Sequence, residues 1–290
     1  MSNTGLIITD LDNTLYDWVT YFATSFEALL HALESTLNMR EEDLIEEFRV
    51  LHREYGTSEQ PFIMLELPSV KDRFPGLDRS ELLTQLEGPV RAFSEARRAT
   101  LKLYDHVAET LETLDKAGYV FVAHTESSTV NAFYRLQRLG IDHFFRKVYV
   151  QSIRWDGHPL PEREAALRPP SGLIRELPKS ERKPNPRLLV DICQQEGFEV
   201  DRTCYVGDSL VRDMAMAKEA GVLAIWARYG TRYDPALWDL LVRITHWTSE
   251  DVEQESRLRE ESGKVEPDYV LDSFDHLPSV LQLATGTVAM

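Results

Sequence analysis

The chain of 290 residues is poor in cysteine and has no long apolar run. Its two cysteines, Cys193 and Cys204, are too few for a disulfide framework, so they fit a reducing compartment and are expected in the core. The first apolar run, Leu6 to Ile8, is too short for a signal peptide and has no basic residues before it. No stretch approaches the roughly 20 apolar residues of a membrane span. We therefore expect a soluble cytoplasmic protein with no membrane partner.

Positive charge is also scarce. Lysine and arginine together number 32 against 48 aspartates and glutamates, so the net charge is −16. A field of this sign repels phosphate backbones, which argues against nucleic-acid binding. It permits a small anionic substrate if a metal ion and a few local cations reverse the charge in one cleft. Because 43% of the residues are hydrophobic and glycine and proline number only 14 each, collagen-like and wholly disordered chains are excluded.

The sequence does contain short apolar runs that alternate with helical patterns. This alternation predicts an α/β fold with a Rossmann-like parallel sheet. Amphipathic stripes between the runs end at Gly118, Gly197 and Gly221, where a helix often stops on a left-handed residue. The expected strands are Leu6–Thr9, Tyr119–Ala123, Val148–Val150, Cys204–Val206, Val222–Trp226 and Tyr269–Leu271.

Three segments interrupt the alternation. Residues 17–96 contain no convincing strand, and their apolar spacing predicts an inserted α-helical domain, with 1–16 and 97–290 forming the α/β core. The segment Ser152–Arg182 is rich in proline and charge and is expected to be a long surface loop. The segment Gly230–Glu266 is expected to be a further insertion that ends in a polar, solvated stretch.

Acidic residues follow two of the expected strands. Asp10 and Asp12 follow the first strand, and Asp208 and Asp213 follow the fourth, where Gly207 allows a sharp turn. Loops at the carboxyl ends of parallel strands form the binding crevice of such sheets, and clustered carboxylates suit a hard cation such as Mg²⁺. Taken singly, these residues also fit an Asp-rich turn or a helix cap. A bound metal explains the crowding of like charges better.

Two further groups stand at comparable positions. The run Thr125-Glu126-Ser127-Ser128 follows the second expected strand, where a hydroxyl and backbone N–H groups can hold a phosphate oxygen. Lys183 lies in KPNP, at the start of the helix before the fourth strand, and would bring one positive charge to the crevice. Alone, the first is most simply a helix cap and the second a surface lysine.

In this order and context, the four motifs resemble those of the haloacid dehalogenase (HAD) superfamily. They read DLDNT, a strand that ends in Thr125, Lys183 in KPNP, and GDSLVRD. The resemblance covers Leu6–Asp17 and roughly Leu101–Leu281. It implies the HAD fold, and the early insertion is similar to the helical cap that closes over the site in this family.

The resemblance also implies roles for individual residues. Asp10 would be the nucleophile that forms an aspartyl-phosphate, and Asp12 would be the general acid and base. An aspartate at position 12 is typical of the phosphatase and phosphomutase branches, because the dehalogenases lack an acid there and P-type ATPases carry threonine. Thr125, Lys183 and the N–H of Glu126 would hold the phosphoryl group. Mg²⁺ would be held by Asp10, the backbone carbonyl of Asp12, and Asp208, with Asp213 in support.

Glu126 departs from the family pattern, since asparagine or glycine often follows the threonine. Its side chain would repel a phosphate, so we expect it to point away. The stretch Leu51–Glu59 is similar to one in the pyrimidine 5′-nucleotidase branch, which makes Arg53, Tyr55 and Thr57 candidates for substrate contact. A helix that simply ends at Gly56 is the plainer interpretation.

The sequence therefore predicts a Mg²⁺-dependent phosphatase of a small phosphorylated metabolite, acting as a monomer or homodimer. Candidate substrates are nucleoside 5′-monophosphates and phosphoglycolate. A phosphotransferase or phosphomutase on the same scaffold, and a non-catalytic binding module, are the alternatives. The full set of acidic residues and Lys183 argues against the last.

Overall fold

The computed structural model describes residues 5–59, 61–152, 168–245 and 265–284. The chain divides into two compact units. The first comprises Met1–Asp17, Leu103–Arg232 and Leu258–Met290, and the second comprises Trp18–Lys102 and Tyr233–Arg257. We call them the core unit and the helical unit and describe each by itself.

The core unit is built on a seven-stranded sheet in which every pairing is parallel, with the strand order β4-β3-β2-β1-β5-β6-β7. β1 is therefore central, with β2 on one side and β5 on the other. The α/β, Rossmann-like fold class predicted from the sequence is confirmed. The strands are β1 (Leu6–Thr9), β2 (Val120–Ser128), β3 (Phe145–Gln151), β4 (Ile174–Leu177), β5 (Thr203–Gly207), β6 (Leu223–Ala227) and β7 (Tyr269–Leu271).

The predicted strands all correspond to observed ones, but the interpretation of 152–182 as a surface loop is wrong in part. β4 lies in this segment and pairs with β3, from Val148 opposite Ile174 to Gln151 opposite Leu177. It is an edge strand of four residues with a charged, half-exposed sequence, IREL, so it carries no apolar run. Residues 153–167, also part of that prediction, lie outside the described residues.

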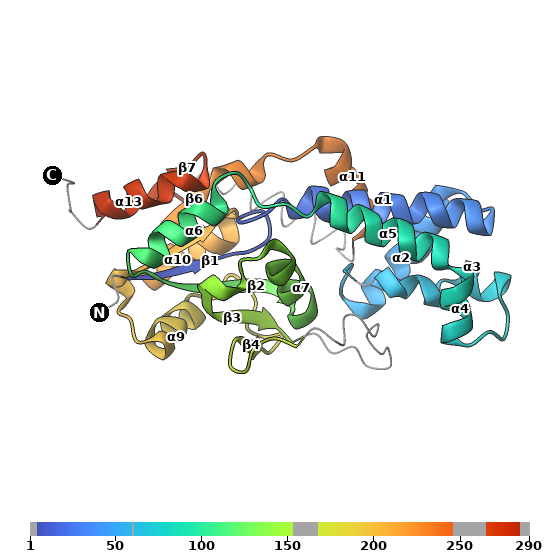
Figure 1. Ribbon diagram of the computed structural model, residues 1–290, viewed down its shortest axis with the longest axis horizontal. Helices are drawn as coiled ribbons and strands as arrows, with labels where there is room; N and C mark the ends of the chain where they lie inside the picture. The colour runs from blue at the N-terminus through green and yellow to red at the C-terminus, as the bar shows by residue number, and fades with distance from the viewer. Residues whose placement is uncertain (1–4, 60, 153–167, 246–264, 285–290) are drawn as a thin grey trace. The chain divides into compact units, whose positions relative to one another are not determined.

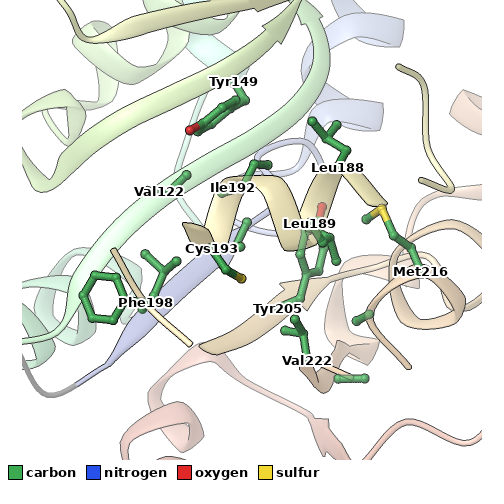
Figure 2. Packing of buried hydrophobic residues seen from close by; sticks show 14 of the residues in the cluster. Val122, Tyr149, Leu188, Leu189, Ile192, Cys193, Phe198, Tyr205, Met216 and Val222 are labelled. Atoms are coloured by element: carbon green, nitrogen blue, oxygen red, sulfur yellow. The ribbon is translucent and has the colours of Figure 1, made fainter. Parts of the chain in front are cut away.

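Both faces of the sheet are buried. Leu6 and Ile8 of β1 point to one face and Ile7 to the other, and all three are at most 1% exposed. On the first face, α9 lays Leu189, Ile192 and Cys193 against side chains of the strands (Figure 2). Burial on both faces explains why the strands read as continuous apolar runs rather than as alternating ones.

The helices of the core unit follow the strands in the order typical of βα crossovers. Where they end, Gly140, Gly197 and Gly221 adopt positive φ, as the sequence predicts for the last two. The helices are α6 (Val107–Lys116), α7 (Thr129–Leu139), α9 (Pro186–Glu196), α10 (Ala215–Ala220) and α13 (Leu277–Ala284), with short turns η2 (Asp142–Phe144), η3 (Val200–Arg202), η4 (Leu210–Met214), η5 (Arg228–Thr231) and η7 (Phe274–His276).

The helical unit contains no strand among its described residues. Its longest helix, α1, buries Phe22, Phe26, Leu29, Leu30 and Leu33 along one side, the stripe that the sequence predicts. The helices are α1 (Trp18–Leu37), α2 (Glu41–Tyr55), η1 (Pro61–Glu66), α3 (Pro68–Arg73), α4 (Arg79–Gln85), α5 (Glu87–Thr100) and α11 (Pro235–Ile244).

The membership of α11 differs from the predicted boundary, which placed everything after residue 96 in the core. α11 packs against α1 and α2 (Figure 1) and belongs to the helical unit. His52 of α2 donates a hydrogen bond from Nδ1 to the carbonyl oxygen of Ile244, at 2.6 Å. Leu240, Leu241 and Ile244 give α11 its buried side. The polar end of the predicted insertion, up to residue 264, lies outside the described residues.

Both cysteines are buried thiols, as predicted. Among the described residues, none of the helices combines the length and the apolar character that crossing a membrane would require.

Candidate active site

The carboxyl end of β1 places Asp10 at the centre of the site. Thr9 of β1 lies opposite Val206 of β5, and the Asp10 amide donates to the Val206 carbonyl at 2.8 Å, so the pairing continues one residue beyond the strand. The Leu11 amide donates to Asp10 Oδ1 at 2.7 Å. The side chain is therefore held by its own backbone at the edge where the ends of β1 and β5 meet.

Lys183 joins the acidic groups from the two strands. Its Nζ lies 2.8 Å from Asp10 Oδ2 and 2.9 Å from Asp213 Oδ1, and its side chain is only 3% exposed. Burial alone would lower the pKa of Lys183, but the charges of Asp10 and Asp213 raise it well above its usual value. Lys183 is thus a permanent cation at the site, not a surface lysine.

Asp213 owes its position to a local distortion of the chain. The residues after Asp208 form a single turn of π-helix, η4, which Ser209 caps by accepting from the Arg212 amide. Asp213 is fully buried, and it accepts from the Tyr205 hydroxyl and the Ser209 amide, both at 3.2 Å. A Cβ on Gly207 would lie 2.4 Å from Asp213 Oδ2, so only glycine fits there.

Carboxylate oxygens of Asp10, Asp208 and Asp213 all lie within 4.8 Å of one another. Burial raises the pKa of Asp10 from 3.8 to about 7, against the opposing effect of Lys183, and the pKa of Asp208 rises in the same direction for the same cause. Three carboxylates gather here beside one lysine, so negative charge is in excess at this cluster. Hard oxygen donors with a deficit of positive charge fit Mg²⁺.

Thr125 and Glu126 lie at the predicted edge, but β2 continues past them to Ser128. Thr125 is buried, and its hydroxyl accepts from the Ser127 amide at 3.1 Å. The Glu126 carboxylate accepts from the Lys183 amide at 3.3 Å and from Arg212 Nη1 at 3.2 Å. The negative charge of the Glu126 side chain is therefore paired with Arg212 of η4 and hydrogen-bonded to the backbone of Lys183. Phosphate contact by Thr125, Lys183 and the Glu126 N–H stays a prediction.

The Asp12 side chain has partners that the sequence did not indicate. Arg135 Nη1 lies 3.1 Å from Asp12 Oδ1, and the Ser127 hydroxyl donates to Asp12 Oδ2 at 2.8 Å. One signal was available, because Arg135 stands in the buried stripe of α7, beside Ala132 and Leu136. The predicted metal contact of Asp12 concerns its backbone carbonyl and stays a prediction.

A second supporting group, also missed, holds the turn after Asp12. Asn13 adopts φ +55, and the Tyr229 hydroxyl donates to the Thr14 carbonyl at 2.5 Å. The backbone of Gly230 lies so close that a Cβ there would stand 1.7 Å from the Asn13 carbonyl oxygen and 3.2 Å from the Asp208 Cβ. Tyr229 and Gly230, the second of which was predicted as the start of an insertion, contact the loop that carries Asp10 and Asp12 and hold it in place.

The predicted substrate residues Arg53, Tyr55 and Thr57 belong to the helical unit. Arg53 is exposed, Tyr55 is partly exposed, and Thr57 is buried, with its hydroxyl accepting from the Glu59 amide at 3.3 Å. α2 ends at Gly56 with φ +66, as the plainer interpretation expects. The role of these residues in substrate contact stays a prediction.

Family models that match this sequence agree with the fold and with the arrangement of the acidic residues and Lys183. The family model described as haloacid dehalogenase-like hydrolase covers residues 4–221, and a second, described as HAD-hydrolase-like, covers residues 180–277. The chain belongs to this family. The resemblance predicted from DLDNT, Lys183 and GDSLVRD is confirmed.

Two relatives and one solved structure illustrate the family. A glyceraldehyde 3-phosphate phosphatase of Methanopyrus kandleri is 27% identical over 79% of this chain and 85% of its own. A phosphoglycolate phosphatase of Haemophilus influenzae is 32% identical, over only 46% of this chain and 48% of its own. The crystal structure of a 2-haloacid dehalogenase from Pseudomonas syringae aligns with a TM-score of 0.54, over 96% of this chain and 98% of its own, at 20% identity, which shows the fold alone.

Proposed function

We propose that this HAD-family enzyme hydrolyses a small phosphate monoester through a covalent intermediate on Asp10. The observation that carries the proposal is the contact of Lys183 with both Asp10 and Asp213, beside Asp208. An Asp10 oxygen that could act as nucleophile, one fixed cation and a candidate cation site lie within a few ångströms of one another, and this arrangement supports phosphoryl transfer. Relatives named as phosphatases support a phosphatase rather than a dehalogenase.

In the first step, an Asp10 carboxylate oxygen attacks phosphorus and the bond from phosphorus to the substrate oxygen breaks. Lys183 offsets the repulsion between the carboxylate and the phosphate dianion. The proton held by the Asp12 carboxyl group goes to the departing alkoxide. The products are an alcohol and an aspartyl-phosphate.

In the second step, Asp12 takes a proton from water while the water oxygen attacks phosphorus. The bond between phosphorus and Asp10 breaks, which releases inorganic phosphate and restores both carboxyl groups. Thr125 and the backbone N–H of Glu126 would hold the phosphoryl oxygens during both transfers. Two easier displacements replace one difficult one.

The residues that would hold Mg²⁺ are Asp10 and Asp208, with Asp213 in support and the Asp12 carbonyl as a further donor. Mg²⁺, when bound there, would supply positive charge that offsets the repulsion between the carboxylates and a phosphate. Hydrolysis would accordingly require a divalent cation.

The substrate we favour is a small phosphorylated metabolite with two or three carbons. The Methanopyrus relative, which the match covers for most of its length, is named for glyceraldehyde 3-phosphate, and the Haemophilus relative for phosphoglycolate. Nucleoside 5′-monophosphates are a second candidate, favoured by the similarity of Leu51–Glu59 to the nucleotidase branch.

The test is release of inorganic phosphate from p-nitrophenyl phosphate and from a panel containing these esters, with Mg²⁺ and with chelator. We expect Asp10→Asn to lower kcat by more than about 10³-fold, because an amide cannot serve as the nucleophile. Asp191→Asn, an exposed aspartate of α9, is the matched control and should keep wild-type rates. Wild-type activity in Asp10→Asn would rule out the covalent mechanism.

A further inference from the structure

Arg135 is the most completely buried cation described near the site, with a side chain only 1% exposed. A buried guanidinium is costly unless it is paired and hydrogen-bonded. Here Nη1 pairs with Asp12 Oδ1 at 3.1 Å, and Nη2 donates to the Ser127 hydroxyl at 2.7 Å. Two of the guanidinium nitrogens therefore meet the Asp12 carboxyl group and the hydroxyl that touches it.

The contacts close a small ring. Ser127 accepts from Arg135 and donates to Asp12 Oδ2 at 2.8 Å, so both carboxyl oxygens of Asp12 are engaged, one by each partner. A carboxyl group held at both oxygens cannot rotate about its terminal torsion without breaking a contact. The guanidinium contacts Asp12 with one nitrogen and Ser127 with another, an arrangement that a lysine ammonium, with its single nitrogen, would not reproduce.

The ring rests on rigid elements. Arg135 Nε donates to the carbonyl oxygen of Asn131, one turn earlier in α7, at 3.1 Å. Its Cζ lies 5.8 Å from the centroid of the Tyr16 ring. Ser127 belongs to the last residues of β2, and Ser128 caps α7 by accepting from the Asn131 amide. The position of the guanidinium is therefore fixed before any substrate binds.

We propose that Arg135, together with Ser127, is a positioning residue that holds the Asp12 carboxyl group where it exchanges protons with the leaving group and with water. Arg135 acts through Asp12 and does not touch the reacting atoms. The inference rests on the proposed function, since it assigns a purpose to Arg135 only if Asp12 is the general acid and base.

Misplacement of a general acid leaves a kinetic signature that simple destabilisation does not. An alkyl leaving group needs the proton from Asp12, whereas p-nitrophenolate leaves without it. kcat/KM reports the first phosphoryl transfer, so the ratio of kcat/KM between an alkyl and an aryl ester isolates the contribution of Asp12 to that step. A loss of folded enzyme would lower both values equally.

The experiment measures kcat/KM for p-nitrophenyl phosphate and for the best alkyl phosphate of the panel. In Arg135→Met, kcat/KM for the alkyl ester should fall about 100-fold and that for the aryl ester less than about 3-fold. Ser127→Ala should change the ratio about 10-fold in the same direction. Arg138→Met, an exposed arginine on the same helix, is the control and should leave the ratio unchanged.

A cycle with Asp12→Asn tests whether Arg135 acts through Asp12. The double variant Asp12→Asn/Arg135→Met should be no slower on the alkyl ester than Asp12→Asn alone. Equal losses on both esters, or additive losses in the cycle, would overturn the positioning role. If Arg135→Met does not fold, Arg135→Lys and Ser127→Ala decide by the same ratio. The proposed function fails separately, through activity that survives Asp10→Asn.

Discussion

At the scale of single residues, two glycines determine how closely the motifs of the site can approach. Gly207 makes room for the Asp213 carboxylate, and Gly230 lies against the backbone of Asn13. The sequence predicted that Gly207 allows a sharp turn, whereas in the structure Gly207 ends β5 without a positive φ and is needed to leave room for Asp213. The need for Gly230 could not be predicted, since its neighbour lies more than two hundred residues away along the chain.

Gly230→Ala tests this close approach. The added Cβ would stand 1.7 Å from the Asn13 carbonyl oxygen, so the loop that carries Asp10 and Asp12 has to move. We expect kcat/KM for p-nitrophenyl phosphate to fall at least about 10²-fold, because a displacement of about 1 Å has that effect on oriented groups. Gly88→Ala, where a Cβ meets nothing within 4 Å, is the control. Wild-type rates in Gly230→Ala would show that the close approach of Gly230 does not determine the position of this loop.

Tyr55→Ala tests the nucleotide hypothesis. If the Tyr55 ring stacks on a base, KM for UMP or CMP should rise about 10-fold, in keeping with the loss of one stacking contact, and KM for p-nitrophenyl phosphate should not change. Steady-state kinetics on the three esters measures this. An equal rise for all three would exclude base recognition by Tyr55.

At the scale of elements, the strands that carry the site were predictable because both of their neighbouring layers are apolar. β1 and β7 were predicted with their observed bounds and β5 to within one residue at each end, whereas β2 runs five residues beyond its predicted end at Ala123. β4 was not predictable, since an edge strand of sequence IREL has no apolar run. The partners of Asp12 were missed for another reason. Arg135 and Ser127 lie far from Asp12 in the sequence, and the only indication of their contact is one arginine within the buried stripe of α7.

α11 shows the same limit in the helical unit. Its stripe of Leu240, Leu241 and Ile244 predicts a buried face but not the partner that buries it. The partner is formed by α1 and α2, which lie far from α11 in the sequence. The assignment of residues 97–290 to one core assumed that residues next to one another in the sequence share a unit. The contacts of α11 with α1 and α2 do not follow that assumption.

His52→Ala tests the attachment of α11. His52 donates to the Ile244 carbonyl and packs against the rings of Phe26 and Phe48, at 5.7 and 5.6 Å between centroids. Loss of the ring should lower the free energy of unfolding of the helical unit by about 2–4 kcal/mol. Urea denaturation followed by tryptophan fluorescence measures it. Val50→Ala, on the exposed side of α2, should change it by less than about 0.5 kcal/mol. Equal stability in both variants would contradict the attachment.

At the scale of the whole molecule, the balance of charge at the site links stability to pH. The sequence has more acidic than basic side chains, with a net charge of −16. The fold gathers some of these acidic side chains around Lys183. Burial raises the pKa of Asp10 from 3.8 to about 7, so the folded, metal-free protein binds a proton that the unfolded chain has lost. This contribution to stability is present below about pH 4 and is lost as the pH rises to about 7.

Magnesium should reverse that trend. Because the metal binds deprotonated carboxylates, its stabilising effect should grow as the pH rises through about 7. We expect excess MgCl₂ to raise Tm clearly at about pH 8 and only slightly at about pH 5.5, compared with NaCl of equal ionic strength. Differential scanning calorimetry measures both. Asp208→Asn should lose most of the shift, and a shift in Tm independent of pH would contradict binding at these carboxylates.

The membership of α11 in the helical unit bears on how the chain matures on the ribosome. Residues 18–102 leave the exit tunnel well before residues 235–244 are made, so the first helices emerge without the helix that covers part of their apolar side. The side of α1 and α2 that later meets α11 stays open to water until residues 235–244 have left the tunnel. A nascent chain halted before Pro235 therefore exposes an apolar surface, of the kind that chaperones bind.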